Sequence, residues 1–245
     1  SREEQKIFHL AEESYSKEIK NLKTLADMQV DVIFISLSAG TVNTGHIKEL
    51  LNSGRNVIMF DRVDELLDIE IVKLNDYLGA YNTVKHMLDK GYKKIAHFSG
   101  PDNLSVYKER KMGYLDALRD NRIDYKHIIN NVITRERGME TMESFIQSGD
   151  TPDGIFAASD FSALGALLAA RKLNIKVPSQ LGIAGFANEP FTEFIYPGIT
   201  TTDQKAALMG KTMAQLFLDN PKGNIKHKET IHPELIIRNS TLKNK

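Results

Sequence analysis

Polar side chains lie just past the carboxyl ends of several predicted strands of this chain, and their types suit hydrogen bonding to a small polar molecule. Carboxylates, amides and hydroxyls can pair with neighbouring hydroxyl groups of one ligand, often through two hydrogen bonds at once. This pattern predicts a site for a polyhydroxyl compound. The residues concerned are Asp61 after the run 56–60, Ser99 after 94–98, Ser159 with Asp160 after 154–157, Asn188 after 181–186, and Gln204 after 200–202.

Two further residues fit the same chemistry from within predicted elements. Arg110 lies in a helical stretch and would supply a guanidinium, and Phe156 lies in the apolar run 154–157 and would supply an aromatic platform. These two residues and Asp160 each have an ordinary structural alternative. Arg110 would then be a surface charge, Phe156 a core side chain, and Asp160 a helix cap.

The motifs of the common enzyme classes are missing from the sequence. The Gly-Lys-Thr triplet at residues 210–212 has Lys205 where a phosphate-binding loop needs glycine, and no Gly-x-Gly-x-x-Gly or Gly-x-Ser-x-Gly occurs. The chain has no cysteine, and its seven histidines show no metal-ligand spacing. We therefore predict no metal, no cofactor and no enzymatic activity. An α/β enzyme using Asp61, Asp160 and His97 in acid–base chemistry stays open as an alternative.

The elements that would position these residues alternate between strand and helix, which predicts an α/β fold with parallel sheets and helices on both faces. In such sheets ligands bind at the carboxyl ends of the strands, where the candidate residues fall. The predicted strands are residues 6–10, 32–36, 56–60, 94–99, 128–133, 154–157, 181–186 and 230–237. The predicted helices are residues 14–28, 81–88, 105–118, 139–147, 160–173 and 205–218.

The composition limits the partners. Of 245 residues, 41% are hydrophobic and 26% are charged, with 32 basic and 32 acidic side chains. A chain with no basic excess is not expected to bind nucleic acid by itself. No apolar run approaches the ~20 residues of a membrane span. The number of strands indicates two lobes, with a break near residues 73–76.

Six segments in register resemble one protein family. Residues 76–101 resemble the "D..GA..A..HL...G...IA...GP" signature of the LacI/GalR bacterial transcription regulators, and residues 105–114 resemble its "S..R..GY" element. Four later segments resemble further family elements, and together the six cover essentially the whole chain. They are residues 152–165 ("P.AIFA.ND..A.G"), 177–186 ("VP.DV.V.GF"), 197–204 ("P.LTT..Q") and 234–241 ("ELI.R.ST").

The resemblance implies the fold of a periplasmic sugar-binding protein, with two α/β lobes, three crossovers and a ligand cleft between the lobes. The N-terminal lobe would comprise residues 1–74 and 202–226, and the C-terminal lobe residues 75–201 and 227–245. The family begins with a helix-turn-helix headpiece and a first strand and helix of the N-terminal lobe. Residues 6–10 match the family's second strand, so we expect these parts to be absent from this chain.

The resemblance also assigns a ligand site. Family effector contacts fall on Asp61, Arg110, Phe156, Ser159 and Gln204. Where the family often has an aspartate after its Gly-Phe pair, this chain has Ala187, and we expect Asn188 to substitute for it. Ser159 replaces the family asparagine and reaches less far.

The function implied is that of an effector-binding and dimerisation domain of a cytoplasmic regulator. It would sense a small molecule, such as a sugar, and would bind operator DNA only through the absent headpiece, as a homodimer. The alternative is a periplasmic sugar-binding protein of a transport system. The identity of the effector, and whether it induces or co-represses, stay open at this point.

Overall fold

The computed structural model describes residues 7–243, and its contacts divide the chain into two compact units. Unit 1 is Ser1–Lys73 with Ala207–Thr230, and unit 2 is Leu74–Ala206 with Ile231–Lys245. The chain therefore passes from one unit to the other three times. The sequence-based breaks lie one to five residues from these positions.

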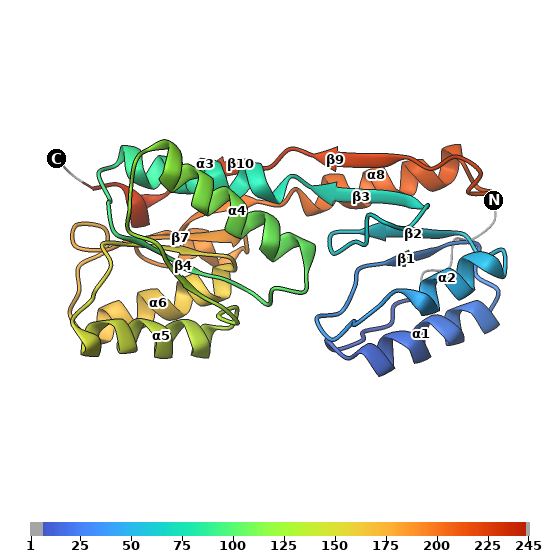
Figure 1. The fold of residues 1–245 in the computed structure, drawn as a ribbon, viewed down its shortest axis with the longest axis horizontal. Coiled ribbons are helices and arrows are strands. Elements are labelled where there is room, and N and C mark those ends of the chain that lie inside the picture. The colour runs from blue at the N-terminus through green and yellow to red at the C-terminus, as the bar shows by residue number, and fades with distance from the viewer. Residues whose placement is uncertain (1–6, 244–245) are drawn as a thin grey trace. The chain divides into compact units, whose positions relative to one another are not determined.

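Unit 2 is built on a six-stranded sheet with the order β10-β8-β7-β6-β4-β5 (Figure 1). Neighbouring strands are parallel except for β10, which pairs antiparallel with β8. β4 and β6 are buried along their whole length, as continuous apolar strands of a parallel sheet should be. The strands are β4 (Ile95–Phe98), β5 (His127–Ile129), β6 (Gly154–Ala157), β7 (Gly182–Ala187), β8 (Thr200–Asp203) and β10 (Glu234–Ile236).

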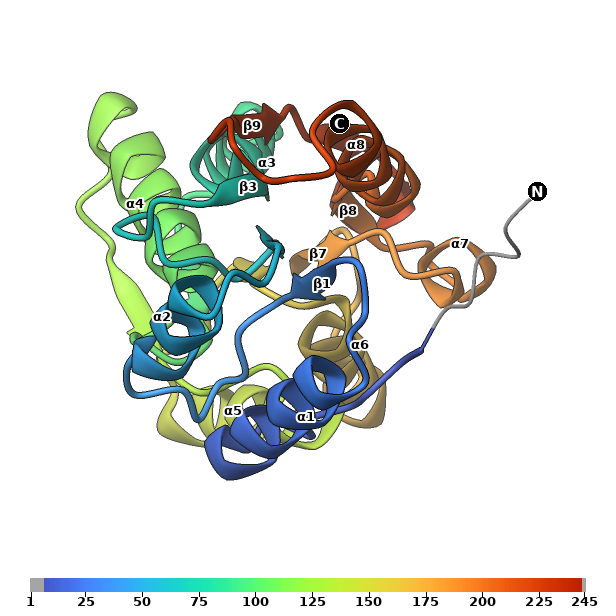
Figure 2. The same cartoon turned by 90° about the vertical axis from the view of Figure 1, so that its right-hand side faces the viewer.

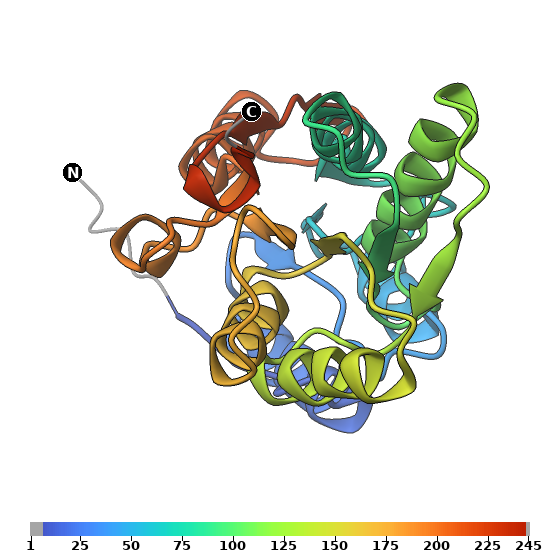
Figure 3. The same ribbon diagram turned by 90° about the vertical axis from the view of Figure 1, so that its left-hand side faces the viewer.

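Helices cover both faces of this sheet (Figures 1 and 3). α5 and α6 lie on one face and bury Met142 and Leu167 in a core shared with Ile155 and Ile183. α3 and α4 lie on the other face, where the Tyr114 hydroxyl donates to the Ile95 carbonyl at 2.8 Å. The helices are α3 (Asp76–Asp89), α4 (Ser105–Asp120), α5 (Arg135–Ser148), α6 (Asp160–Lys172), the short α7 (Phe191–Phe194) and the 3-10 turn Asn239–Thr241.

Unit 1 contains a four-stranded sheet with the order β1-β2-β3-β9 (Figure 1), and Figure 2 labels β1, β3 and β9 from the side. The last residues of β3 and β9 belong to unit 2. β1, β2 and β3 are parallel. The strands are β1 (Ile33–Ile35), β2 (Val57–Phe60), β3 (Glu70–Leu74) and β9 (Lys228–Ile231), and the helices are α1 (Tyr15–Asp27), α2 (Gly45–Asn52) and α8 (Ala206–Asp219).

The core of unit 1 lies between its sheet and the helices α1 and α2. Leu22 of α1 and Ile47 of α2 pack there against Ile33 and Met59. Apolar side chains elsewhere in the unit are more exposed to solvent. Phe34 of β1 is 39% exposed, and the apolar helix α8 buries only Met209.

Several sequence-based predictions need correction. The predicted strand at residues 6–10 is wrong over its described part, where residues 7–10 form no strand and Phe8 is 85% exposed. An apolar segment forms a strand only beside a hydrogen-bonding neighbour, and residues 7–10 have none among the strands described. The run 230–237 divides into β9 and β10, and residues 130–133 fall outside β5. α2, β3 and α7 were not predicted.

No helix within residues 7–243 is long and apolar enough to cross a lipid bilayer.

Candidate functional site

Arg110 is the most constrained of the predicted site residues. It lies on α4, is 4% exposed, and its Nε donates to the Asp76 carboxylate at 2.7 Å. One terminal nitrogen also contacts Asp76 at 2.7 Å, and the other donates to the Ala158 carbonyl at 2.7 Å. The guanidinium lies 3.8 Å from the centre of the Phe186 ring. The surface-charge alternative is therefore wrong, and Arg110 is held rigidly beside the end of β6.

Phe156 is fully buried in β6, next to β4 in the sheet. Its ring is stacked on His97 with 4.8 Å between ring centres and 10° between ring planes. His97 in turn lies against Tyr114 of α4, 5.1 Å away. The structure thus places Phe156 in an aromatic stack on the α4 face of the sheet, close behind the strand end.

Ser159 begins α6 and serves as its N-cap. Its hydroxyl oxygen accepts from the Phe161 N–H at 3.2 Å, which satisfies one of the free N–H groups of the first turn. The predicted cap, Asp160, is wrong by one residue. Asp160 is the first residue inside the helix and points its carboxylate elsewhere.

Asp160 instead fixes the loop that follows β7. Its carboxylate accepts from the Thr201 hydroxyl at 2.7 Å and from the Glu189 N–H at 2.8 Å. The side chain is fully buried, and burial raises the pKa of Asp160 to about 6. A glycine at 185 gives it room, since a Cβ there would lie 2.1 Å from the Asp160 oxygen.

Asn188 lies in that loop in a left-handed backbone conformation, with φ of 59°. Asparagine tolerates this conformation better than most residues. Its side-chain oxygen accepts from Arg238 at 3.0 Å, and its N–H donates to the Thr201 hydroxyl at 3.2 Å. Arg238 therefore orients the Asn188 amide, whose NH₂ group is left to face another partner.

Gln204 follows β8 and emerges beside Asn188. β7 and β8 pair in parallel with Ala187 opposite Asp203, so the next residue on each strand leaves the sheet at the same level. Gln204 is half-buried.

Asp61 belongs to unit 1 and follows β2. It has φ of 55°, and its N–H donates to the Val72 carbonyl of β3 at 3.1 Å. The Ser36 hydroxyl, at the end of β1, donates to its carboxylate at 3.5 Å. Asp61 is thus fixed by Ser36 at the end of β1 and by Val72 in the middle of β3.

The structure brings five of the six predicted residues to one edge of the unit 2 sheet. Each lies at, or is hydrogen-bonded to, the carboxyl end of β6, β7 or β8, where parallel sheets bind ligands. They are Arg110, Phe156, Ser159, Asn188 and Gln204.

Three residues that support these five were not predicted as ligand-site residues, although His97 was considered for acid–base chemistry. Asp76 pairs with Arg110, Arg238 holds Asn188, and His97 stacks on Phe156. All three lie within the family-like segments, and His97 also interrupts an otherwise apolar strand, which was a further available signal. His97 is fully buried against two rings, and burial lowers its pKa to about 4.

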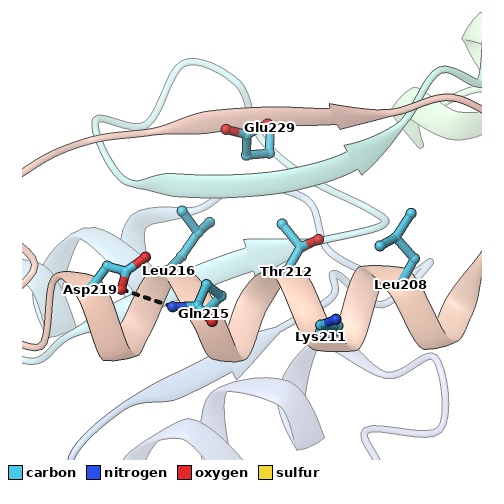
Figure 4. A pocket seen from close by; sticks show the side chains of 7 residues that line it. All are labelled: Leu208, Lys211, Thr212, Gln215, Leu216, Asp219 and Glu229. Carbon is cyan, nitrogen blue, oxygen red and sulfur yellow. Dashed lines mark hydrogen bonds between the residues drawn. The ribbon is translucent and has the colours of Figure 1, made fainter.

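A separate hollow of about 340 Å³ lies along α8 in unit 1 (Figure 4). Its lining mixes leucine side chains with charged and amide groups, and it contains none of the predicted site residues. The hollow is lined by Leu208, Lys211, Thr212, Gln215, Leu216, Asp219 and Glu229. Within the part of the chain that the structure describes, no three histidine or acidic side chains gather in a way that could hold a metal ion.

Comparison with known proteins gives consistent matches. The Periplasmic binding protein-like domain family matches residues 84–241. The chain is 31% identical over 189 residues to the HTH-type transcriptional repressor CytR of Escherichia coli (strain K12), covering 76% of this chain and 55% of CytR. It is also 31% identical over 230 residues to the HTH-type transcriptional regulator DegA of Bacillus subtilis (strain 168), covering 92% of this chain and 68% of DegA. The chain thus spans about half the length of CytR.

Solved structures show the same fold. A LacI family transcriptional regulator from Enterococcus faecium, with bound ribose, aligns with a TM-score of 0.83 at 27% identity. The alignment covers 93% of this chain and 85% of that one.

Proposed function

This chain belongs to the LacI family of transcriptional regulators, within the periplasmic-binding-protein-like fold, and from that premise we propose that it senses a small polyhydroxyl effector, such as a sugar. The proposal extends to a dimeric regulator that acts on operator DNA in the cytoplasm. The relatives reported above are transcription regulators, which favours this function over a transport receptor or an enzyme.

One observation carries the proposal. Four side chains that can hydrogen-bond and the ring of Phe156 gather at the carboxyl edge of the unit 2 sheet, with Arg110 already fixed by Asp76 and Asn188 by Arg238. Side chains that are held before the ligand arrives lose little conformational entropy on binding, which favours affinity. Donors and acceptors at one edge match a molecule that carries several hydroxyl groups.

A sugar is the effector class we favour. The regulator from Enterococcus faecium was solved with ribose bound, and it shares 27% identity with this chain. Ala187 in place of a family aspartate, and Ser159 in place of asparagine, imply different hydrogen bonds in this chain. We therefore treat ribose as a probe and not as the assigned effector.

Regulation would follow from linkage. If the effector favours one of two states of the dimer and operator DNA favours the same or the other, each ligand changes the affinity for the other by the same factor. The sign of that coupling decides between induction and co-repression.

The first test is a thermal-shift screen with D-ribose, D-glucose, cellobiose and adenosine. A compound present at about 100 times its dissociation constant should add about 2.7 kcal/mol to the free energy of unfolding. A screen in which no compound raises the melting temperature would contradict the proposal for these ligand classes.

Asp61 enters the proposal through the family resemblance, and a mutation tests it separately. Asp61→Asn keeps a residue that tolerates φ of 55° while removing the carboxylate. We expect affinity for the stabilising compound to fall by roughly 1–3 kcal/mol, because a ligand group would be left unpaired. Asp68→Asn, an exposed change in the same unit, is the matched control and should leave affinity unchanged.

Regulator and transport receptor can be separated by reading the coding region upstream of Ser1. A helix-turn-helix segment there would support the regulator. A signal peptide would overturn it in favour of the receptor.

A further inference from the structure

Two polar atoms on β4 and the residue after it are buried without a hydrogen-bond partner among the residues described. They are His97 Nε2 and Ser99 Oγ, and both residues are 0% exposed. Because they are two residues apart on a strand, their side chains lie on the same face of the sheet, the one that α4 covers. A buried polar group left unpaired costs roughly 1–3 kcal/mol, so two neighbouring ones require an explanation.

The protonation of His97 follows from its surroundings. Its Nδ1 lies 3.0 Å from the Phe156 carbonyl oxygen, and a carbonyl only accepts, so Nδ1 carries the proton. Burial lowers the pKa of the ring to about 4, with Arg110 and Lys111 acting in the same direction. At neutral pH the ring is therefore uncharged, and Nε2 presents a lone pair that needs a donor.

Ser99 lies level with Arg110 along the packed pair of β4 and α4. Two contacts align the strand with the helix. Tyr114 lies beside Ile95 and His97. The Tyr107 ring lies against Gly100, and a Cβ on Gly100 would come within 2.4 Å of that ring. Arg110 lies between Tyr107 and Tyr114 on α4, which places it opposite the strand end.

Arg110 retains hydrogen-bonding capacity there. Its bonds to Asp76 and to the Ala158 carbonyl use one N–H of each terminal nitrogen, and each terminal nitrogen carries two. Its positive charge is already balanced by the buried Asp76 carboxylate. The group can therefore donate hydrogen bonds without offering a net charge to an anion.

We propose that His97 Nε2, Ser99 Oγ and the remaining N–H groups of Arg110 form a subsite that binds a hydroxyl group of an uncharged ligand and discriminates against its phosphorylated form. The subsite rests on the proposed function, since it specifies the class of effector bound at the same sheet edge. A hydroxyl group donates to Nε2 while accepting from Arg110. A phosphate that is mostly dianionic at pH 7 has little proton to offer Nε2 and finds no uncompensated cation.

Burial makes this discrimination strong. A site built to hydrogen-bond a hydroxyl rejects ligands that lack it far better than an apolar pocket rejects an extra group, because its own polar atoms are then left unpaired. His97 and Ser99 would thus act as specificity determinants beyond the residues carried over from the family.

Ser99→Ala tests the subsite directly. The change removes an unpaired hydroxyl and little volume, so we expect the melting temperature without ligand to stay the same or rise. In the same variant, affinity for D-ribose or D-glucose, whichever binds the wild type, should fall about three- to tenfold, measured by calorimetry. The opposite directions of the two effects separate a ligand role from a structural one.

Tyr125→Phe is the matched control. The Tyr125 hydroxyl is also buried and unpaired, but it precedes β5 and so lies at the amino end of the sheet. Its removal should leave sugar affinity unchanged. His97→Phe, which keeps the aromatic stack, should weaken sugar binding and narrow the preference for D-ribose over ribose 5-phosphate.

The outcomes separate this inference from the function it rests on. If a sugar binds and Ser99→Ala leaves its affinity unchanged, or lowers only the melting temperature as loss of a site for an internal water would, the subsite is wrong and the sensor stands. Tighter binding of ribose 5-phosphate or glucose 6-phosphate than of the free sugars also overturns the subsite. If no compound binds the wild type, both proposals fail together.

Discussion

Unit 2 encloses its sheet between two pairs of helices, whereas unit 1 leaves apolar surface at the edge and on one helix. In unit 2 the strands β4 and β6 are buried at every residue. In unit 1, Phe34 of the edge strand β1 is 39% exposed, and on α8 Leu208 and Leu218 are 48% and 63% exposed. The central strands of unit 2 are therefore covered more completely than the edge strand β1 and the helix α8 of unit 1.

The effect of a substitution on stability depends on how closely its surroundings are packed. In a closely packed core a small change of side-chain volume causes a large loss of stability, because the neighbouring atoms cannot move aside. An exposed helix takes the same change at little cost. Substitutions in the two units should therefore change the free energy of unfolding by different amounts.

The largest effect is expected at the buried ion pair of unit 2. Arg110→Ala removes the guanidinium that pairs with the buried Asp76 carboxylate, and loss of one member of such a pair costs about 3–5 kcal/mol. Urea unfolding followed by circular dichroism measures this. The double variant Arg110→Met with Asp76→Leu should recover most of the loss, and a single-variant loss below about 1 kcal/mol would contradict the packing described for α3 and α4.

The next effect concerns the contact between α5 and α6. A Cβ on Gly165 would lie 2.0 Å from the Arg135 carbonyl oxygen, and backbone cannot step aside as a flexible side chain can. We expect Gly165→Ala to destabilise the protein by roughly 1–3 kcal/mol or more, as overpacking does. Hydrogen exchange should locate the loss in α5 and α6, with protection in α1 and α2 unchanged.

A smaller effect separates the two units by pH. His97 has its pKa depressed from the ordinary 6.5 to about 4 by burial, so the unfolded chain takes up its proton first as the pH falls. Stability linked to the neutral ring is present above pH 6.5 and is lost as the pH falls towards 4. Asp160, raised to about 6 by burial, acts in the opposite direction and gains stability on acidification.

The variant His97→Phe removes the first of these opposing contributions. Between pH 7 and pH 5 its free energy of unfolding should rise relative to wild type by roughly 1–2 kcal/mol. In unit 1, burial raises the pKa of Glu18, but hydrogen bonds from His46, the Ser38 N–H and Thr41 outweigh burial and hold the pKa below its usual value. The stability that the Glu18 carboxylate contributes is therefore lost only below about pH 4.5. If the free energy of unfolding of the variant and of the wild type changed with pH in parallel, His97 would not be the group responsible.

The smallest effect has the opposite sign and belongs to α8. A Cβ on Gly210 would meet no heavy atom within 4 Å. Gly210→Ala should therefore stabilise the protein by about 0.5–1 kcal/mol through helix propensity alone. The same substitution thus destabilises at Gly165 and stabilises at Gly210, and a loss at Gly210 would show that α8 is packed more closely than described.

The fold was largely predictable because buried parallel strands are written as continuous apolar runs. β2, β4, β6 and β7 each correspond to such a run. β3 was missed because Glu70 and Lys73 interrupt it. Glu70 is 1% exposed, and the Asn220 side chain donates to it at 3.0 Å. Asn220 is 150 residues away from Glu70 in sequence, so no local sequence pattern could have predicted this contact.

The position of the candidate site could be predicted from the sequence, but the hydrogen bonds and ion pairs within it could not. Strand ends indicate where ligand-contacting residues fall, which located Asn188 and Gln204. The ion pair of Arg110 with Asp76, and the use of Asp160 to hold the loop after β7, depend on tertiary contacts. Residue type alone favoured the commoner roles of surface charge and helix cap.

The three passages between units also govern how the chain can fold during synthesis. Unit 1 takes its last helix and strand from residues 207–230, and unit 2 takes β10 and the 3-10 turn from residues after 230. The Ser240 hydroxyl donates to the Ile183 carbonyl at 2.5 Å and accepts from the Thr200 N–H at 2.8 Å. Neither unit can therefore complete its hydrogen bonding until nearly the whole chain has left the ribosome, and both must wait in a partly folded state that is open to chaperones.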